Sequence, residues 1–451
     1  MTPKPLILVV IDGLTPSMFE AVVGSGEAPT LAMLAAQGEY RRGTSVFPSL
    51  TPVCLSSIAT GAHGDVHEIP HLVWYDRSAK RLVEYGSSFG AVRAAGIGRT
   101  LQDTLVNMNR QHLGTSAVTV FESLADAGLR TAATNFTAYR GRTRHRSMLP
   151  FFDDVFGPER FFFYNLYSSD RTGAPLSFRN RPAGSIDSYA AAVGRWLVTR
   201  DAFDFLVFYL SDYDYASHEH GPDTALAALQ RSDDAVGSLI DAAGGLDEFL
   251  ERYSVVVMAD HGQTRVREVA TLGAALADVD AVLPLASNRA GHIYLQSGCR
   301  LDPREVAARL DDVDAVEVAL FREGDCAIAR RAGEEFSFCP ALGGGFATTG
   351  DAAILDYPDA LARVWAALGN PNAGEVLVSA TDGFEFTDLG GGSHLGGGSH
   401  GSLSVGDSEV PLLTVGVDAA LGSSPSIVDV TPMILSHFGV TAPTYAIVRA
   451  A

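Results

Sequence analysis

Cysteine is scarce in this sequence. The 451 residues contain four cysteines, Cys54, Cys299, Cys326 and Cys339, and none forms a Cys-x-x-Cys pair. This excludes a dense disulfide framework. We expect reduced thiols, with a bridge between Cys326 and Cys339 as the alternative.

Positive charge and long apolar runs are also scarce. Lys and Arg number 33 against 53 Asp and Glu, a formal net charge of −20. Such a surface repels a long nucleic-acid backbone, but a small phosphorylated substrate is compatible with it if metal ions supply local positive charge. No segment approaches the roughly 20 apolar residues of a membrane helix. The apolar run at 6–10 ends at an acidic residue without a small-residue cleavage site, which favours a buried strand over a signal peptide. We therefore expect a cytoplasmic protein with no membrane span, and the sequence does not indicate its oligomeric state.

Apolar residues are plentiful, at 47% of the chain. Short aliphatic runs of strand length alternate with helical patterns, which predicts an α/β fold: a doubly wound, mainly parallel sheet covered by helices on both faces. The predicted strands are 6–10, 205–210, 254–258, 376–379 and 411–415. The predicted helices are 30–36, 118–127, 188–198, 225–243 and 428–438.

Two regions interrupt this alternation. Residues 150–185 are rich in aromatic residues, Arg, Gly and Ser, which predicts a cap or long loop near a pocket. Residues 266–374 contain their own strand and helix signals, which predicts an inserted α+β subdomain. The core then comprises 1–265 and 375–451, and the glycine-rich stretch before the last strand has the composition of a linker.

Acidic residues and one histidine directly follow three of the predicted strands. Asp12 comes just past the first, Asp212 and Asp214 just past the second, and Asp260 and His261 just past the third. Ligand sites of doubly wound folds lie at the carboxyl ends of the strands. One such Asp is usually a turn or helix cap, but three together indicate a site.

Two further histidines extend this set. His218 follows Asp214 by four residues, so both project from one face if the segment is helical. His400 lies in the glycine-rich stretch, where the alternative is a solvated loop residue. Mixed Asp and His ligation suits zinc best, with manganese or iron as alternatives.

Thr51 begins a helical pattern, with Pro52 at its first turn. The ordinary interpretation is that Thr51 caps the helix. The functional interpretation uses the same position, because a helix amino terminus favours an anion and a phosphate bound there would meet the hydroxyl.

The motifs VVIDG, TPVCLSSIATG, DYASHEHGP, VVVMADHG and SHGS occur in this order between residues 9 and 402. This set resembles the alkaline phosphatase superfamily, in particular its type I phosphodiesterase and nucleotide pyrophosphatase branch. The resemblance implies two divalent metal ions, with zinc as the best match, and Thr51 as the nucleophile beside the second ion. The implied ligands are Asp214, His218 and His400 for one ion, and Asp12, Asp260, His261 and Thr51 for the other. His394 is the rival of His400 for the last ligand position.

The substrate pocket departs from the family pattern. Leu72 stands where the family has an asparagine that binds the phosphoryl oxygen, and the neighbouring His71 is the candidate replacement. Arg140, Arg142 and Arg144 alternate in a basic stretch and would share one face of a strand, where they could bind a second phosphate or carboxylate. A solvated edge is the alternative.

These patterns predict a metal-dependent phosphohydrolase that cleaves phosphodiester or pyrophosphate bonds of a small substrate. The alternatives are a phosphomonoesterase or phosphonate hydrolase of the same superfamily and, more remotely, a catalytically silent binding protein on this fold. A sulfatase would need Cys or Ser in a C/S-x-P-x-R context and a phosphoglycerate mutase a serine nucleophile, and neither is present at Thr51.

Overall fold

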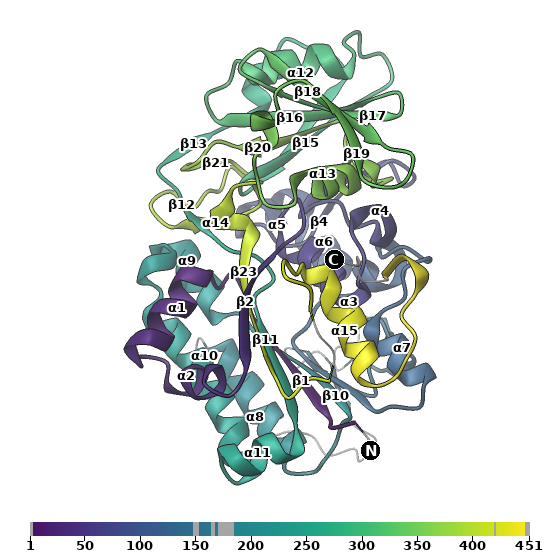
Figure 1. The fold of residues 1–451 in the computed structure, drawn as a ribbon. Coiled ribbons are helices and arrows are strands. Elements are labelled where there is room, and N and C mark those ends of the chain that lie inside the picture. The colour runs from purple at the N-terminus through teal and green to yellow at the C-terminus, as the bar shows by residue number, and fades with distance from the viewer. Residues whose placement is uncertain (1–2, 148–152, 164–166, 170–184, 419–420, 447–451) are drawn as a thin grey trace.

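The computed structural model describes residues 3–147, 153–163, 167–169, 185–418 and 421–446. Its central sheet is eight-stranded, in the order β2-β23-β11-β1-β10-β5-β8-β9 (Figure 1). Its strands are β2 (Glu39–Thr44), β23 (Glu409–Val415), β11 (Ser254–Met258), β1 (Leu6–Ile11), β10 (Phe205–Leu210), β5 (Thr131–Thr134), β8 (Arg160–Phe163) and β9 (Tyr167–Ser169). The five strands from β11 to β8 run parallel, and the other three are antiparallel to their neighbours.

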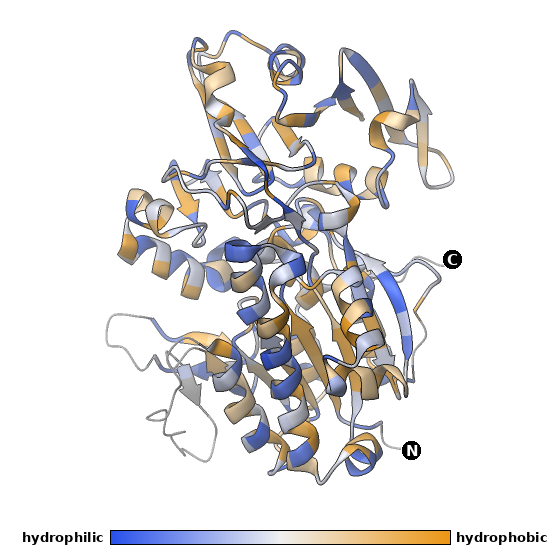
Figure 2. Ribbon diagram, turned by 90° about the vertical axis from the view of Figure 1, so that its left-hand side faces the viewer, coloured by the Kyte–Doolittle hydropathy of each residue, from blue (hydrophilic) through white to orange (hydrophobic). Residues whose placement is uncertain are grey.

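Helices cover both faces of this sheet (Figure 1). One layer contains α1 (Pro16–Ser25), α2 (Pro29–Ala35), α8 (Ile186–Val198), α9 (Asp212–His220), α10 (Leu226–Ala243) and α11 (Leu246–Arg252), and the other contains α3 (Thr51–Thr60), α7 (Val120–Asp126) and α15 (Val430–His437). All six residues of β1 and of β10 are buried, as expected for strands covered twice. Figure 2 shows the same contrast, with mostly hydrophobic strands behind helices that carry hydrophilic residues. The predicted fold class is confirmed.

A second, antiparallel sheet lies beyond one end of the first (Figure 1). Its seven strands, in spatial order, are β14 (Val282–Ser287), β15 (Ala290–Leu295), β20 (Val376–Ala380), β16 (Val316–Glu323), β17 (Cys326–Arg331), β18 (Glu334–Pro340) and β19 (Phe346–Thr349). The helix α12 (Pro303–Asp311) packs on one face and α13 (Ala360–Gly369) on the other, each with its own apolar cluster.

The remaining helices and strands are short. They are α4 (Gly64–His67), β3 (Val73–Asp76), β4 (Arg81–Glu84), α5 (Phe89–Ala95), α6 (Ile97–Gln102), a π-helix (Asp103–His112), the pairs β6 (Thr143–His145) with β7 (Val155–Gly157), β12 (Thr264–Arg265) with β22 (Gly398–Ser399) and β13 (Glu268–Ala270) with β21 (Phe384–Phe386), and α14 (Val405–Ser408).

Three predictions from the sequence need correction. The run at 376–379 was assigned to the core, but β20 pairs with β15 and β16 of the second sheet. The described part of 150–185 is not a cap: β8 and β9 extend the central sheet, while 150–152, 164–166 and 170–184 lie outside the described residues. Cys326 and Cys339 are not reduced thiols but form a disulfide across β17 and β18, whereas Cys54 and Cys299 are free.

Among the described helices, none combines the length and apolar character needed to cross a membrane.

A buried ion pair joins the second sheet to the first. The Nη1 of Arg289, in the turn between β14 and β15, lies 2.7 Å from Oδ1 of Asp407, in α14 just before β23. Both side chains are fully buried. The other carboxylate oxygen of Asp407 accepts hydrogen bonds from the backbone and the hydroxyl of Ser402. The pair thus fixes the loop that carries His400 against the second sheet.

Removing one partner of this pair is expected to destabilise the fold strongly. Asp407→Ala leaves the buried Arg289 charge with only the exposed Asp382, 3.7 Å away, and loss of a buried partner typically costs about 3–5 kcal/mol of unfolding free energy. Replacing both, as Arg289→Met with Asp407→Leu, should cost less than either single change, as measured by denaturant unfolding. A single variant within about 1 kcal/mol of wild type, the usual value of an exposed pair, would contradict this.

Candidate active site

The predicted metal ligands converge at one edge of the central sheet. Asp12 follows β1, Asp214 lies in the first turn of α9 just after β10, and Asp260 and His261 follow β11. These three strands are neighbours, so their carboxyl ends meet. His400 arrives from the loop after β22. The convergence follows from three adjacent parallel strands that each end in a polar residue.

One group surrounds His261. Its Nε2 lies 3.4 Å from Oδ1 of Asp12, 3.5 Å from Oδ2 of Asp260 and 3.1 Å from Oγ1 of Thr51. All three ligand side chains are buried, and these two carboxylate oxygens have no hydrogen-bond partner in the described part of the chain. Asp12, Asp260 and His261 therefore each offer a ligand atom within 4.8 Å of the other two, close enough to hold one divalent cation, and the Thr51 hydroxyl lies beside His261.

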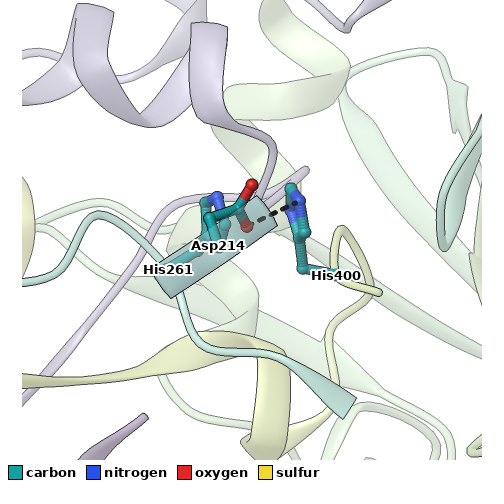
Figure 3. Close-up of side chains that lie close together, drawn as sticks. All are labelled: Asp214, His261 and His400. Atoms are coloured by element: carbon teal, nitrogen blue, oxygen red, sulfur yellow. Dashed lines mark ion pairs between the residues drawn. The ribbon is translucent and has the colours of Figure 1, made fainter. Parts of the chain in front are cut away.

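A second group surrounds Asp214. Its Oδ2 lies 3.4 Å from His218 Nε2, and its Oδ1 lies 3.9 Å from His400 Nε2. Figure 3 shows Asp214 and His400 facing each other, with His261 beside them. The His261 and His400 rings stack with centroids 3.6 Å apart, so the two groups adjoin. Asp214, His261 and His400 each offer a ligand atom within 4.8 Å of the other two, and His218 lies beside Asp214.

All three histidines are oriented for metal binding through Nε2. Nδ1 donates a hydrogen bond to a backbone carbonyl in each: His218 to Gly398 at 2.8 Å, His261 to Gly262 at 3.0 Å and His400 to Ser49 at 2.8 Å. Because a carbonyl only accepts, the proton of the neutral ring lies on Nδ1 and the lone pair on Nε2.

Electrostatics favour a cation at this site. Burial, followed by repulsion from Asp214 and Asp260, raises the pKa of Asp12 well above its usual value. Burial also raises the pKa of Asp260. Burial lowers the pKa of His218 and, more strongly, of His400, where neighbouring histidines add to the effect. Divalent ions would stabilise the ionised carboxylates and need neutral imidazoles, so the residues present fit such ions.

Two residues that sequence reasoning missed orient the carboxylates. The Tyr209 hydroxyl donates to Asp12 Oδ2, and the Gln263 amide donates to Asp214 Oδ1. Gln263 also accepts from the Ser217 hydroxyl. Gln263 lies two residues after His261, and this position could have indicated its role, because residues near a metal ligand commonly form hydrogen bonds to the ligands.

Thr51 is the first residue of α3, and Leu50 is the N-cap, so the ordinary capping interpretation of Thr51 is wrong. Its half-buried side chain lines a cavity of about 640 Å³ together with Asp12, Asp214, His218 and His400. The lining also includes the apolar or aromatic residues Leu72, Phe89, Val92, Leu105, Met108, Phe163 and Tyr215, together with hydroxyl side chains such as those of Ser87 and Thr104. No Lys or Arg occurs among the described residues that line the cavity.

Other predicted residues lie elsewhere. His71 is fully buried against His292, with ring centroids 4.8 Å apart, and does not line this cavity. Arg140, Arg142 and Arg144 line a separate cavity of about 1100 Å³. They pair with acidic residues there: Arg140 and Arg142 with Glu122, Arg142 also with Asp126, and Arg144 with Asp154.

His394 lines the cavity but is not part of either ligand cluster. Its Nδ1 lies 2.6 Å from the buried carboxylate of Glu385, and its ring packs 4.0 Å from that of His218. The structure thus favours His400 over His394 for the last ligand position.

The chain is similar to known hydrolases over nearly its whole length. Phosphonoacetate hydrolase from Sinorhizobium meliloti, solved with phosphonoformate, matches with a TM-score of 0.65 and 18% identity over 97% of this chain and 96% of that one. Murine ectonucleotide pyrophosphatase/phosphodiesterase 5 matches with a TM-score of 0.63 and 14% identity over 99% of this chain and 98% of the murine one. An inactive threonine-to-alanine variant of the murine protein, in complex with AMP, matches with a TM-score of 0.64 and 14% identity over 99% of this chain and 97% of the murine one.

At these identities the solved structures show a shared fold. The family model of type I phosphodiesterase / nucleotide pyrophosphatase matches residues 6–403, which contain every candidate metal ligand described above. The chain therefore belongs to the type I phosphodiesterase / nucleotide pyrophosphatase family, a group of phosphoester hydrolases in the alkaline phosphatase superfamily.

Proposed function

We propose that the protein hydrolyses phosphodiester or pyrophosphate bonds with Thr51 as nucleophile and two bound divalent ions. The observation that carries this proposal is the position of Thr51 Oγ1, 3.1 Å from His261 Nε2, at the edge of a cluster of three buried carboxylates and three histidines. Asp12, Asp260 and His261 would hold one ion and Asp214, His218 and His400 the other. Mixed carboxylate and imidazole ligation suits zinc, with manganese or iron as alternatives.

The chain's own residues account for the positioning. When bound, the ions supply Lewis acidity for the attacking and leaving oxygens. Thr51 Oγ1 lies at the amino terminus of α3, where the helix dipole favours the anionic phosphoryl group. Attack by Oγ1 on phosphorus expels the alcohol or phosphate leaving group and leaves a threonine ester. Water then cleaves that ester and restores the hydroxyl.

The cavity wall favours a substrate with an uncharged organic group. Phosphonoacetate and phosphonoformate, the ligands named for the Sinorhizobium enzyme, each carry a carboxylate besides the phosphonate. A second anion needs a cationic partner, and the described lining residues include no Lys or Arg. Phe89 and Tyr215 instead expose aromatic rings at this cavity, which suits a base, an aryl group or an alkyl chain.

We propose that the substrate is small and that the protein binds no long nucleic acid, because a net charge of −20 repels a phosphate backbone. The cytoplasmic location remains a prediction, and the bridge between Cys326 and Cys339 counts against it, because stable disulfides are typical of oxidising compartments.

A substrate panel tests the reaction type. The protein would be loaded with zinc or manganese and given bis-p-nitrophenyl phosphate, p-nitrophenyl phosphate and phosphonoacetate. We expect kcat/KM for the diester to exceed the other two by about 10-fold or more, the discrimination that pocket contacts commonly provide. A preference for phosphonoacetate would contradict the diesterase assignment, and no turnover of any compound would favour the silent binding protein.

A further inference from the structure

The second sheet contributes one residue to the active-site cavity. Asn288 lies in the tight turn between β14 and β15 and lines the cavity that contains Thr51 and His400. The turn is fixed against both neighbouring loops, because Arg289 N donates to the His400 carbonyl at 2.9 Å and Phe386 N donates to the Asn288 carbonyl at 2.8 Å. Asn288 has φ 58°, a left-handed conformation that asparagine tolerates better than most residues.

The orientation of the Asn288 amide follows from its neighbours. The Ser287 hydroxyl donates to Oδ1 at 3.0 Å, and Nδ2 lies 3.1 Å from His400 Nε2. Because the Ser287 hydroxyl donates to Oδ1, the NH₂ of Asn288 is the group that faces His400 Nε2, and an ion bound to this Nε2 would leave both amide hydrogens for another acceptor. The two amide hydrogens therefore lie on the side of the metal ligands. The residue is 95% buried, so water does not compete freely for these donors.

Asn288 has no equivalent among the other described lining residues. It is the only side-chain amide there, and no Lys or Arg accompanies it. Leu72, which stands where the family has an asparagine, lines the same cavity with an aliphatic side chain, and His71 is buried elsewhere. A phosphoryl group in this cavity would thus find one side-chain amide among the described lining residues, supplied by the turn between β14 and β15.

We infer that Asn288 is a catalytic residue whose amide donates a hydrogen bond to a nonbridging oxygen of the substrate's phosphoryl group. The inference rests on the proposed function and identifies how the second sheet takes part in it. A fixed donor aimed at an oxygen that gains charge in the transition state lowers the barrier without reorganisation during the reaction. The donor that the family places after the nucleophile is here replaced from a different part of the chain.

Two variants test this role. Asn288→Gly removes the amide and keeps the turn, because glycine adopts positive φ without strain. Asn288→Asp keeps the size and replaces the donor by an acceptor. With metal content and thermal unfolding at wild-type values, we expect kcat for bis-p-nitrophenyl phosphate to fall about 10²- to 10³-fold in both variants, as for loss of one oxyanion donor. Inhibition by orthovanadate should weaken by at least about 10-fold, a binding change that a merely structural role would not produce.

Asn372→Gly is the matched control. Asn372 is also an amide of the second unit that reaches the first, but its Nδ2 donates to the Glu68 carbonyl outside the cavity. This variant should leave vanadate inhibition unchanged. If the wild-type protein hydrolyses the diester and both Asn288 variants keep kcat and vanadate inhibition within about 2-fold, the inference is overturned while the proposed function stands. Absence of hydrolysis by the metal-loaded wild type would instead overturn the proposed function.

Discussion

Replacing Thr51 by alanine is expected to abolish hydrolysis of bis-p-nitrophenyl phosphate, with kcat reduced by about 10⁴-fold or more, as for other nucleophile deletions. The reason is that Oγ1 is the side-chain hydroxyl 3.1 Å from His261 Nε2, at the shared edge of both ligand groups. The three carboxylates and three imidazoles remain, so metal content by plasma mass spectrometry should stay near the wild-type value. Thr51→Ser retains a hydroxyl and should keep part of the activity.

Thr60→Ala is the control for damage to the helix. Thr60 is the last residue of α3, and its hydroxyl donates to the Ser56 carbonyl rather than facing the cavity. This variant should retain nearly full activity. A Thr51→Ala protein that hydrolyses the diester as fast as wild type would disprove the nucleophile assignment.

Removal of the metal ions is expected to have the second large effect. Dialysis against a chelator should lower activity by about 10³-fold, the equivalent of several kcal/mol of transition-state stabilisation. It should also lower the melting temperature, because a ligand present at 100 times its Kd stabilises the folded state by about 2.7 kcal/mol. Adding zinc or manganese back should restore both. Full activity after exhaustive chelation would exclude a metal-dependent reaction.

The stripped protein should also respond to pH in a defined direction. Burial raises the folded-state pKa of Asp12 and Asp260 above their unfolded value of 3.8. An acid with a raised folded-state pKa binds its proton more tightly when folded, so stability is fully present below pH 3.8 and declines as pH rises toward the raised pKa. We expect Asp12→Asn to flatten this decline in the stripped protein, measured as melting temperature between pH 5 and 8. The same decline in both proteins would contradict this assignment.

The central residues of the site could be predicted because each is marked by its local sequence, a polar residue just after an apolar strand. Asp12, Asp214 and the pair Asp260 and His261 each directly follow a strand that is apolar on both faces, and the carboxyl ends of adjacent parallel strands converge. The predicted strands 6–10, 205–210 and 254–258 therefore located the ligands before any tertiary contact was known.

The remainder depends on contacts between distant segments. Asn288 reaches the cavity through a turn of the second sheet, 112 residues before His400, and nothing in its local sequence indicates a site. The run at 376–379 is as apolar as a core strand, because a strand buried between α12 and α13 needs the same residues. The alternating arginines Arg140, Arg142 and Arg144 predicted an anion-binding site. In the structure their guanidinium groups pair instead with carboxylates of the same chain, those of Glu122, Asp126 and Asp154, and the local sequence does not show these partners.

The most direct test is a crystal structure of the zinc-loaded protein with data collected on both sides of the zinc absorption edge. We expect two anomalous peaks, one coordinated by Asp12, Asp260 and His261 and the other by Asp214, His218 and His400, with Thr51 Oγ1 beside them. A single peak, peaks elsewhere, or a Thr51 side chain turned away from both ions would contradict it.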